Sequence, residues 1–130
     1  MDILIIGASP PCVRCIRLFQ LAKQLAQQIE AEITVRKIPL NSSEAKNYGK
    51  IGTAHDIAEL AKMAFDMEHI EALARTWSKE LDDELMKYKE RAEDMGYLMT
   101  PVLIINGRVK TMGFVPEAEK IRDWIESELS

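Results

Sequence analysis

The chain has 130 residues, of which 47% are hydrophobic and 29% charged, a composition typical of one soluble globular domain. This balance excludes a disordered, collagen-like or disulfide-scaffold chain. Seventeen Lys and Arg against 21 Asp and Glu give a formal net charge of −4, which provides no general attraction to nucleic acid or anionic lipid. We therefore expect no nucleic-acid partner and no membrane association.

The start of the chain carries no recognisable targeting segment. Its apolar run, Ile3 to Ile6, ends at Gly7, whereas a signal peptide needs roughly 7–15 apolar residues and a membrane span roughly 20. We therefore expect a cytoplasmic protein. A reducing compartment does not favour a structural disulfide, so the two cysteines, Cys12 and Cys15, point to thiol chemistry.

Hydrophobic spacing predicts a strand, a helix and a second strand in the first part of the chain. The uninterrupted apolar run within residues 2–6 indicates a short buried strand. Apolar residues three and four apart predict a helix over residues 15–29. Alternation of apolar and polar residues then predicts a strand over residues 32–38.

The C-terminal part predicts a hairpin followed by a helix. Residues 101–105 and 108–112 read as two strands, joined by the dipeptide Asn106-Gly107 that two-residue hairpin turns prefer. Pro116 then opens a last helix. Together with the first unit, this order predicts a compact α/β fold with a mixed four-stranded sheet covered by helices.

The middle of the chain is unusually long and helical. No Pro or Gly occurs from Thr53 to Met95, and Thr53 with Asp56 has the spacing of a capping box. Because this length exceeds an ordinary globular helix, we expect two helices with a break near residues 66–69.

Polar residues in this region are interpreted as solvent-facing. The two histidines, His55 and His69, lie far from the cysteines in sequence and are expected to be solvated helix residues. The acids from Glu80 to Asp94, with the bases among them, are expected to form a solvated helix face. Trp77 is expected to anchor this region to the rest of the domain.

The motif that carries chemistry is Cys12-Val13-Arg14-Cys15, where the first strand has ended and the helix begins. Two intervening residues place both thiols within one helical turn, close enough to form a disulfide. The first thiol lies at the helix N-terminus, where free N–H groups and the helix dipole favour an anion, and Arg14 adds positive charge. We therefore expect Cys12 to be the attacking thiolate and Cys15 the resolving thiol.

At these residues the chain resembles the thioredoxin superfamily, in particular its small, glutaredoxin-sized redox-active disulfide proteins. The resemblance rests on the cysteine pair, Met99-Thr100-Pro101 before the hairpin, Asn106-Gly107, and Gly113-Phe114-Val115-Pro116 before the last helix. It implies a thioredoxin-like fold of β-α-β, helical insertion, β-hairpin and C-terminal helix. The whole chain, residues 1–130, would form a single domain with residues 41–98 as an enlarged helical insertion.

The resemblance also implies roles for individual residues. It implies a cis peptide bond before Pro101 and a Thr100 main chain that pairs with an extended segment of the partner. Cys12 and Cys15 would be catalytic, and the substrate contacts would come from Pro11, Arg14, Thr100 and Pro101. The implied partners are a protein disulfide and an upstream thiol reductase. No cofactor or metal is expected, because the cysteine pair itself stores the two electrons, and the oligomeric state is left open.

The sequence departs from the family pattern in three places. Thioredoxins proper carry Trp before the first cysteine and Gly-Pro between the two, where this chain has Pro11, Val13 and Arg14. The wholly apolar first strand offers no counterpart to the buried acid that thioredoxins keep beneath the disulfide. These departures do not favour general protein-disulfide reduction or glutathione use. We therefore expect a thiol-disulfide oxidoreductase that is a partner-specific electron donor.

Two alternatives are left open by the residues alone. In the first alternative, the protein is a binding or assembly module whose dithiol holds a metal or metalloid. Since two thiolates do not complete tetrahedral zinc, that reading needs further ligands, for example from a second subunit. The second alternative is a redox sensor whose affinity for a partner changes on oxidation.

Overall fold

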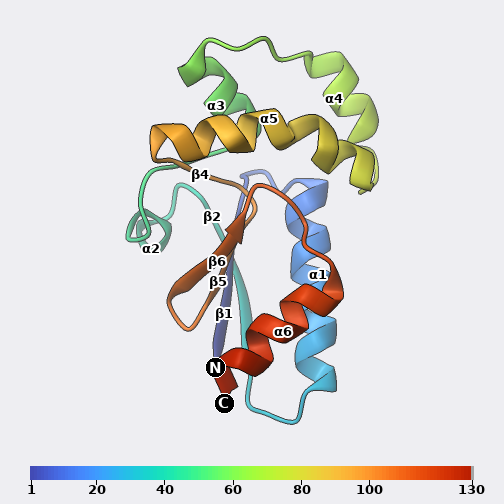
Figure 1. Cartoon of the computed structure of the whole chain (residues 1–130), viewed down its shortest axis with the longest axis vertical. Coiled ribbons are helices and arrows are strands. Elements are labelled where there is room, and N and C mark those ends of the chain that lie inside the picture. The colour runs from blue at the N-terminus through green and yellow to red at the C-terminus, as the bar shows by residue number, and fades with distance from the viewer. Residues whose placement is uncertain (130) are drawn as a thin grey trace.

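A sheet with the strand order β2-β1-β5-β6 forms the centre of the fold in the computed structural model, which describes residues 1–129 (Figure 1). Its strands are β1 (Asp2–Gly7), β2 (Thr34–Pro39), β5 (Val102–Ile105) and β6 (Arg108–Met112). Strand β1 runs parallel to β2 and antiparallel to β5, and β5 runs antiparallel to β6. The predicted mixed four-stranded sheet is therefore confirmed.

Two helices, α1 (Val13–Gln28) and α6 (Ala118–Leu129), cover one face of the sheet (Figure 1). Alternate residues of a strand point to opposite faces, so Ile3 and Ile5 of β1 enter the same buried cluster as Leu103 and Ile105 of β5. The helices complete this cluster with Leu18, Ala22, Leu25, Ile121 and Ile125. Burial of these apolar side chains holds α1, and with it the cysteine motif, against the sheet.

The opposite face of the sheet packs against residues 41–98. Leu4 and Ile6 of β1 and Ile104 of β5 belong to a second buried cluster. That cluster takes most of its members from the 41–98 segment, among them Ala45, Ile57, Leu81, Leu85 and Tyr88. The segment therefore shares a hydrophobic core with the sheet.

The 41–98 segment contains more elements than the sequence predicted. Its helices are α2 (Ser43–Lys46), α3 (Ala54–Ala61), α4 (Met67–Leu73) and α5 (Lys79–Met95). Its two short strands, β3 (Ile51–Gly52) and β4 (Leu98–Met99), pair in parallel as a separate sheet.

The prediction of two helices with a break near residues 66–69 is wrong. Three helices follow Thr53, and the first ends at Lys62, which has a left-handed backbone with φ of 56°. Asp66 begins α4 rather than interrupting a helix, because its side chain accepts a hydrogen bond from the His69 N–H. Ser78 caps α5 in the same way. The predicted capping box of Thr53 and Asp56 is confirmed at the start of α3.

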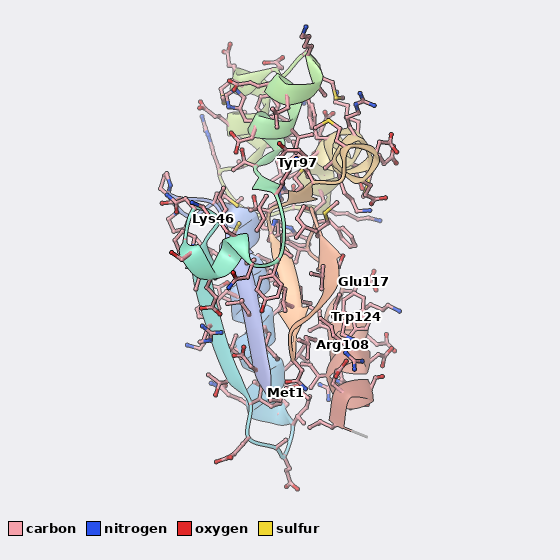
Figure 2. All side chains as sticks on the ribbon, turned by 90° about the vertical axis from the view of Figure 1, so that its left-hand side faces the viewer. Met1, Lys46, Tyr97, Arg108, Glu117 and Trp124 are labelled. Carbon is pink, nitrogen blue, oxygen red and sulfur yellow. The ribbon has the colours of Figure 1, made fainter. Side chains whose placement is uncertain are left out.

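Helices α3, α4 and α5 form a layer beyond the end of the sheet where α1 begins (Figure 1). Figure 2 shows Met1 and Arg108 near the opposite end of the molecule from this layer, and Tyr97 where the chain leaves it. Across residues 1–129, no helix combines the length and apolar character that a membrane crossing requires. The arrangement places the N-terminus of α1 beneath the helical layer.

Candidate active site

Cys12 and Cys15 lie at the N-terminus of α1 as free thiols. Cys12 is the N-cap residue, and its sulfur accepts a hydrogen bond from the Cys15 N–H at 3.3 Å. The two sulfur atoms lie 2.7 Å apart, at hydrogen-bond distance. Cys15 is fully buried while Cys12 is partly exposed. The predicted geometry, with both thiols in one turn and the outer one accessible, is therefore present.

The surroundings of the two thiols separate their pKa values. The pKa of Cys12 falls from 9.0 to about 6, mainly because the Cys15 thiol donates a hydrogen bond to it. Burial opposes this change, whereas the Cys15 N–H and the positive charge of Arg14 add to it. The same hydrogen bond, together with burial, raises the pKa of Cys15. At neutral pH the thiolate therefore resides on Cys12, and Cys15 keeps its proton.

Gly7, at the end of β1, packs directly against the inner thiol. A Cβ atom at this position would lie 3.0 Å from the Cβ and 3.1 Å from the Sγ of Cys15. A side chain at this position would press against Cys15, so glycine suits the close approach of α1 to β1. In the sequence, Gly7 marks only the end of an apolar run. A glycine between a buried strand and a cysteine pair is the signal that identifies this contact.

The peptide bond between Thr100 and Pro101 is cis, as predicted, and both residues are buried. Ser9-Pro10, in the loop before Cys12, is a second cis peptide bond that the sequence analysis did not predict. Thr100 and Cys12 border the same cavity. The structure thus brings the predicted proline loop to the cysteine pair.

The main chain of Thr100 is engaged within the protein. Its N–H donates to the Gly52 carbonyl of β3 at 3.0 Å, and its carbonyl accepts from Arg14 Nη2 at 3.1 Å. The structure differs here from the expectation that Thr100 pairs with an extended partner segment. Strand β3, which the sequence did not predict, lies alongside the main chain of Thr100. We call this side of the cis-proline loop the Thr100 edge.

Arg14 lies inside the protein, with only 4% of its surface exposed. Its Nη1 atom lies 3.2 Å from Asp82 Oδ1 and also donates to the Gly113 carbonyl. Asp82 Oδ2 in turn accepts from the Val115 N–H at 3.1 Å and from Trp77 Nε1 at 3.3 Å. Arg14 also borders the cavity beside Cys12, so the expected substrate contact from its side chain stays a prediction. The guanidinium joins the cysteine motif to α5 and to the loops around β5 and β6.

Asp82 is the functional residue that the sequence analysis missed. It was assigned to a solvated helix face, yet it is 5% exposed and belongs to the buried side of α5. The chain does therefore keep a buried acid near the site, supplied by α5 rather than by the first strand. The signal lies in its spacing, because Asp82 stands between Leu81 and Leu85 in the apolar stripe of α5.

The remaining predicted residues occupy different positions around the motif. Pro11 is exposed directly before Cys12. His55 and His69 have side chains 44% and 49% exposed and lie near Glu59 and Glu84, in agreement with solvated helix positions. His55 also borders the cavity beside Cys12, which the sequence did not indicate. The hydrogen bond from Trp77 to Asp82 lies within the 41–98 region, whereas the Arg17 guanidinium of α1 lies 5.1 Å from the centroid of the Trp77 ring and brings that ring against the rest of the domain.

Within residues 1–129, no group of three or more His, Cys, Asp or Glu side chains is placed to share a metal ion. The site thus consists of a dithiol at a helix N-terminus, a cis proline beside it and a buried ion pair behind it. These features define a dithiol protein of the thioredoxin type.

Comparison with known families agrees with this class. Residues 52–126 match the family described as a thioredoxin domain. The match spans more than half of the chain, which therefore belongs to the thioredoxin domain family. The matched region contains the cis proline, the hairpin and helices α3 to α5. The cysteine pair lies before it. No curated protein and no solved structure matches the chain.

The lowered pKa of Cys12 predicts how alkylation depends on pH. Because only the thiolate reacts, the iodoacetamide rate at Cys12 should rise through a midpoint near pH 6 and fall as the pH drops below it. Cys15 should react only at much higher pH. Quenched-flow alkylation with peptide mass spectrometry measures both rates. In denaturant both midpoints should move to about 8.5, and a folded-state midpoint of 8 or above at Cys12 would contradict the assignment.

The buried ion pair predicts a large stability difference between neighbouring acids. Asp82→Ala leaves the Arg14 guanidinium buried without its counter-ion, which costs about 3–5 kcal/mol in comparable sites. Asp83→Ala, at the exposed next position of α5, should change the free energy of unfolding by less than about 0.5 kcal/mol. Urea denaturation of both variants measures the difference, and equal effects would disprove the role of the pair.

Proposed function

We propose that this protein is a thiol-disulfide oxidoreductase of the cytoplasm in which Cys12 is the nucleophile and Cys15 the resolving thiol. The observation that carries the proposal is the thiol pair at the start of α1. There the outer thiol has a pKa of about 6, and the inner thiol keeps its proton. The neighbouring cis Thr100-Pro101 bond and membership of the thioredoxin domain family support it.

The exchange reaction takes place in two steps. The Cys12 thiolate attacks one sulfur of the substrate disulfide, forms a mixed disulfide and releases the first substrate thiolate, which takes a proton from solvent. Cys15 then loses its proton and attacks Cys12 Sγ, which releases the second thiol and leaves a Cys12-Cys15 disulfide. Two electrons have passed to the substrate. A thiol reductase must return them, and the protein needs no bound cofactor for either step.

The 41–98 segment gives this proposal its specificity. We treat the chain as one domain in which this segment is inserted between β2 and β5 and lies over the cysteine pair. Strand β3 occupies the Thr100 edge, and α5 supplies Asp82 to Arg14. Such a covered site favours a restricted set of substrates over general protein-disulfide reduction.

A redox titration tests the proposed function. The protein is equilibrated in graded dithiol redox buffers, acid-quenched, alkylated and weighed by mass spectrometry. We expect a reversible two-electron step with both thiols oxidised together, at a midpoint between about −200 and −300 mV. Thiols that stay free at every potential would refute the proposal, and thiols protected by a bound metal would favour the binding-module alternative.

Single cysteine variants separate the two proposed roles. Cys12→Ser should abolish exchange with a disulfide, because the remaining thiol is fully buried and a substrate disulfide does not reach it. Cys15→Ser should still react once and then stop as a stable mixed disulfide at Cys12. The reverse pattern, with Cys12→Ser forming the mixed disulfide, would show that the roles are exchanged.

A further inference from the structure

A cavity of about 220 Å³ opens beside Cys12, between the start of α1 and the helices of the 41–98 segment. Its walls come mainly from apolar side chains of α1, the α3–α4 loop, α4 and α5. The main ones are Val13, Phe65, Ile70, Ala74, Leu81 and Leu85. The nucleophilic thiol therefore faces a small hydrophobic compartment.

Apart from the Cys12 thiolate, the polar groups that border this cavity are already engaged within the protein. Arg14 borders the cavity, but its charge is paired with Asp82, which lies outside the lining. The Thr53 hydroxyl accepts a hydrogen bond from the Asp56 N–H as part of the α3 cap. The His55 side chain is 44% exposed, and the centroid of its ring lies 5.1 Å from that of Phe65. An anionic compound would lose its hydration on entry and meet the Cys12 thiolate without gaining a counter-ion, which is strongly unfavourable. The cavity therefore favours an uncharged occupant.

The second observation is that strand β3 closes the Thr100 edge to an extended substrate segment. Its single N–H already donates to Gly52 of β3, and a peptide N–H has only one proton to donate. A substrate in extended conformation would have to displace β3 before it could add to this edge. A compound that enters the cavity reaches Cys12 without that displacement.

We propose that the substrates of Cys12 are small, uncharged, apolar disulfides, one half of which lies in this cavity during attack. The proposal rests on the proposed function and names its substrate class. Its size limit follows from volume: a cavity of about 150 Å³ holds benzene, whereas drug-sized ligands occupy about 300–1,000 Å³. A half-molecule of a few carbon atoms therefore fits.

The reaction balances with an external dithiol as reductant. Cys12 thiolate breaks the S–S bond of RSSR, forms Cys12-S-S-R and releases RS⁻, which becomes RSH. Attack by Cys15 on Cys12 Sγ releases the second RSH and leaves the Cys12-Cys15 disulfide. One RSSR and two protein thiols thus give two RSH and one protein disulfide. A dithiol of the dithiothreitol class then reduces that disulfide and is itself oxidised.

Three disulfides of similar size but different polarity test the substrate class. The reduced full-length protein is mixed with dipropyl disulfide, bis(2-hydroxyethyl) disulfide or dithiodiacetate, and Cys12-Cys15 oxidation is followed by acid quench and mass spectrometry. Each rate constant is divided by that of dithiothreitol with the same disulfide, which removes intrinsic reactivity. We expect the normalised rate for dipropyl disulfide to exceed the hydroxyethyl rate at least tenfold, with dithiodiacetate slowest. Equal normalised rates would overturn the proposal.

A matched pair of variants locates this preference in the cavity. Ala74→Phe places a large side chain in the cavity wall, whereas Ala72→Phe makes the same change on the exposed side of α4. Ala74→Phe should remove the dipropyl preference, and Ala72→Phe should keep it. Retention of the preference in Ala74→Phe, with folding confirmed by circular dichroism, would show that the disulfide binds elsewhere.

Failure of this proposal is distinguishable from failure of the proposed function. Reversible oxidation of the pair by dithiol buffer, as in the redox titration, tests the function without any apolar substrate. With that step intact, reduction of insulin disulfides should be at least tenfold slower than reduction of dipropyl disulfide. Insulin reduction at an equal or higher rate would overturn the small-substrate assignment and leave the oxidoreductase function standing.

Discussion

The hydrogen bonding of the Thr100 main chain is the constraint on which the rest of the site depends. Its N–H is held by Gly52 of β3 and its carbonyl by Arg14. These two bonds place the cis-proline loop between the cysteine motif and the 41–98 segment. In a thioredoxin-like site with an open edge, these groups would be available to a partner. Here the chain satisfies them itself, so these groups are engaged before any partner arrives.

Arg14 connects this edge to the thiol chemistry. One guanidinium bonds to the Thr100 carbonyl, the Gly113 carbonyl and Asp82, while its charge lowers the pKa of Cys12. A buried guanidinium is stable only when its charge is paired and its donors are used, and Asp82 of α5 meets that need. The 41–98 segment therefore completes the surroundings of the cysteine motif, because α5 supplies the counter-ion of its buried cation.

The sequence predicted the elements with strong local signals and missed those that depend on tertiary contacts. Apolar runs and the Asn106-Gly107 turn located the sheet to within two residues at each strand end. The cysteine pair and the cis bond before Pro101 were also found, since both follow from short motifs. The burial of Asp82 and Arg14 was not predicted, because a charged side chain is expected at the surface. Each of the two is buried only because it forms an ion pair with the other. Strand β3 was missed because two residues carry no periodicity, and its pairing with β4 spans more than 40 residues of chain.

The most direct test of this account is native-state amide hydrogen exchange at Thr100, measured by NMR on the reduced protein. We predict that this amide exchanges as slowly as that of Leu98, whose N–H donates to the Lys50 carbonyl at 2.8 Å. An amide at Thr100 that exchanges at the rate of an unstructured peptide would show that β3 leaves the edge open, and would contradict the account.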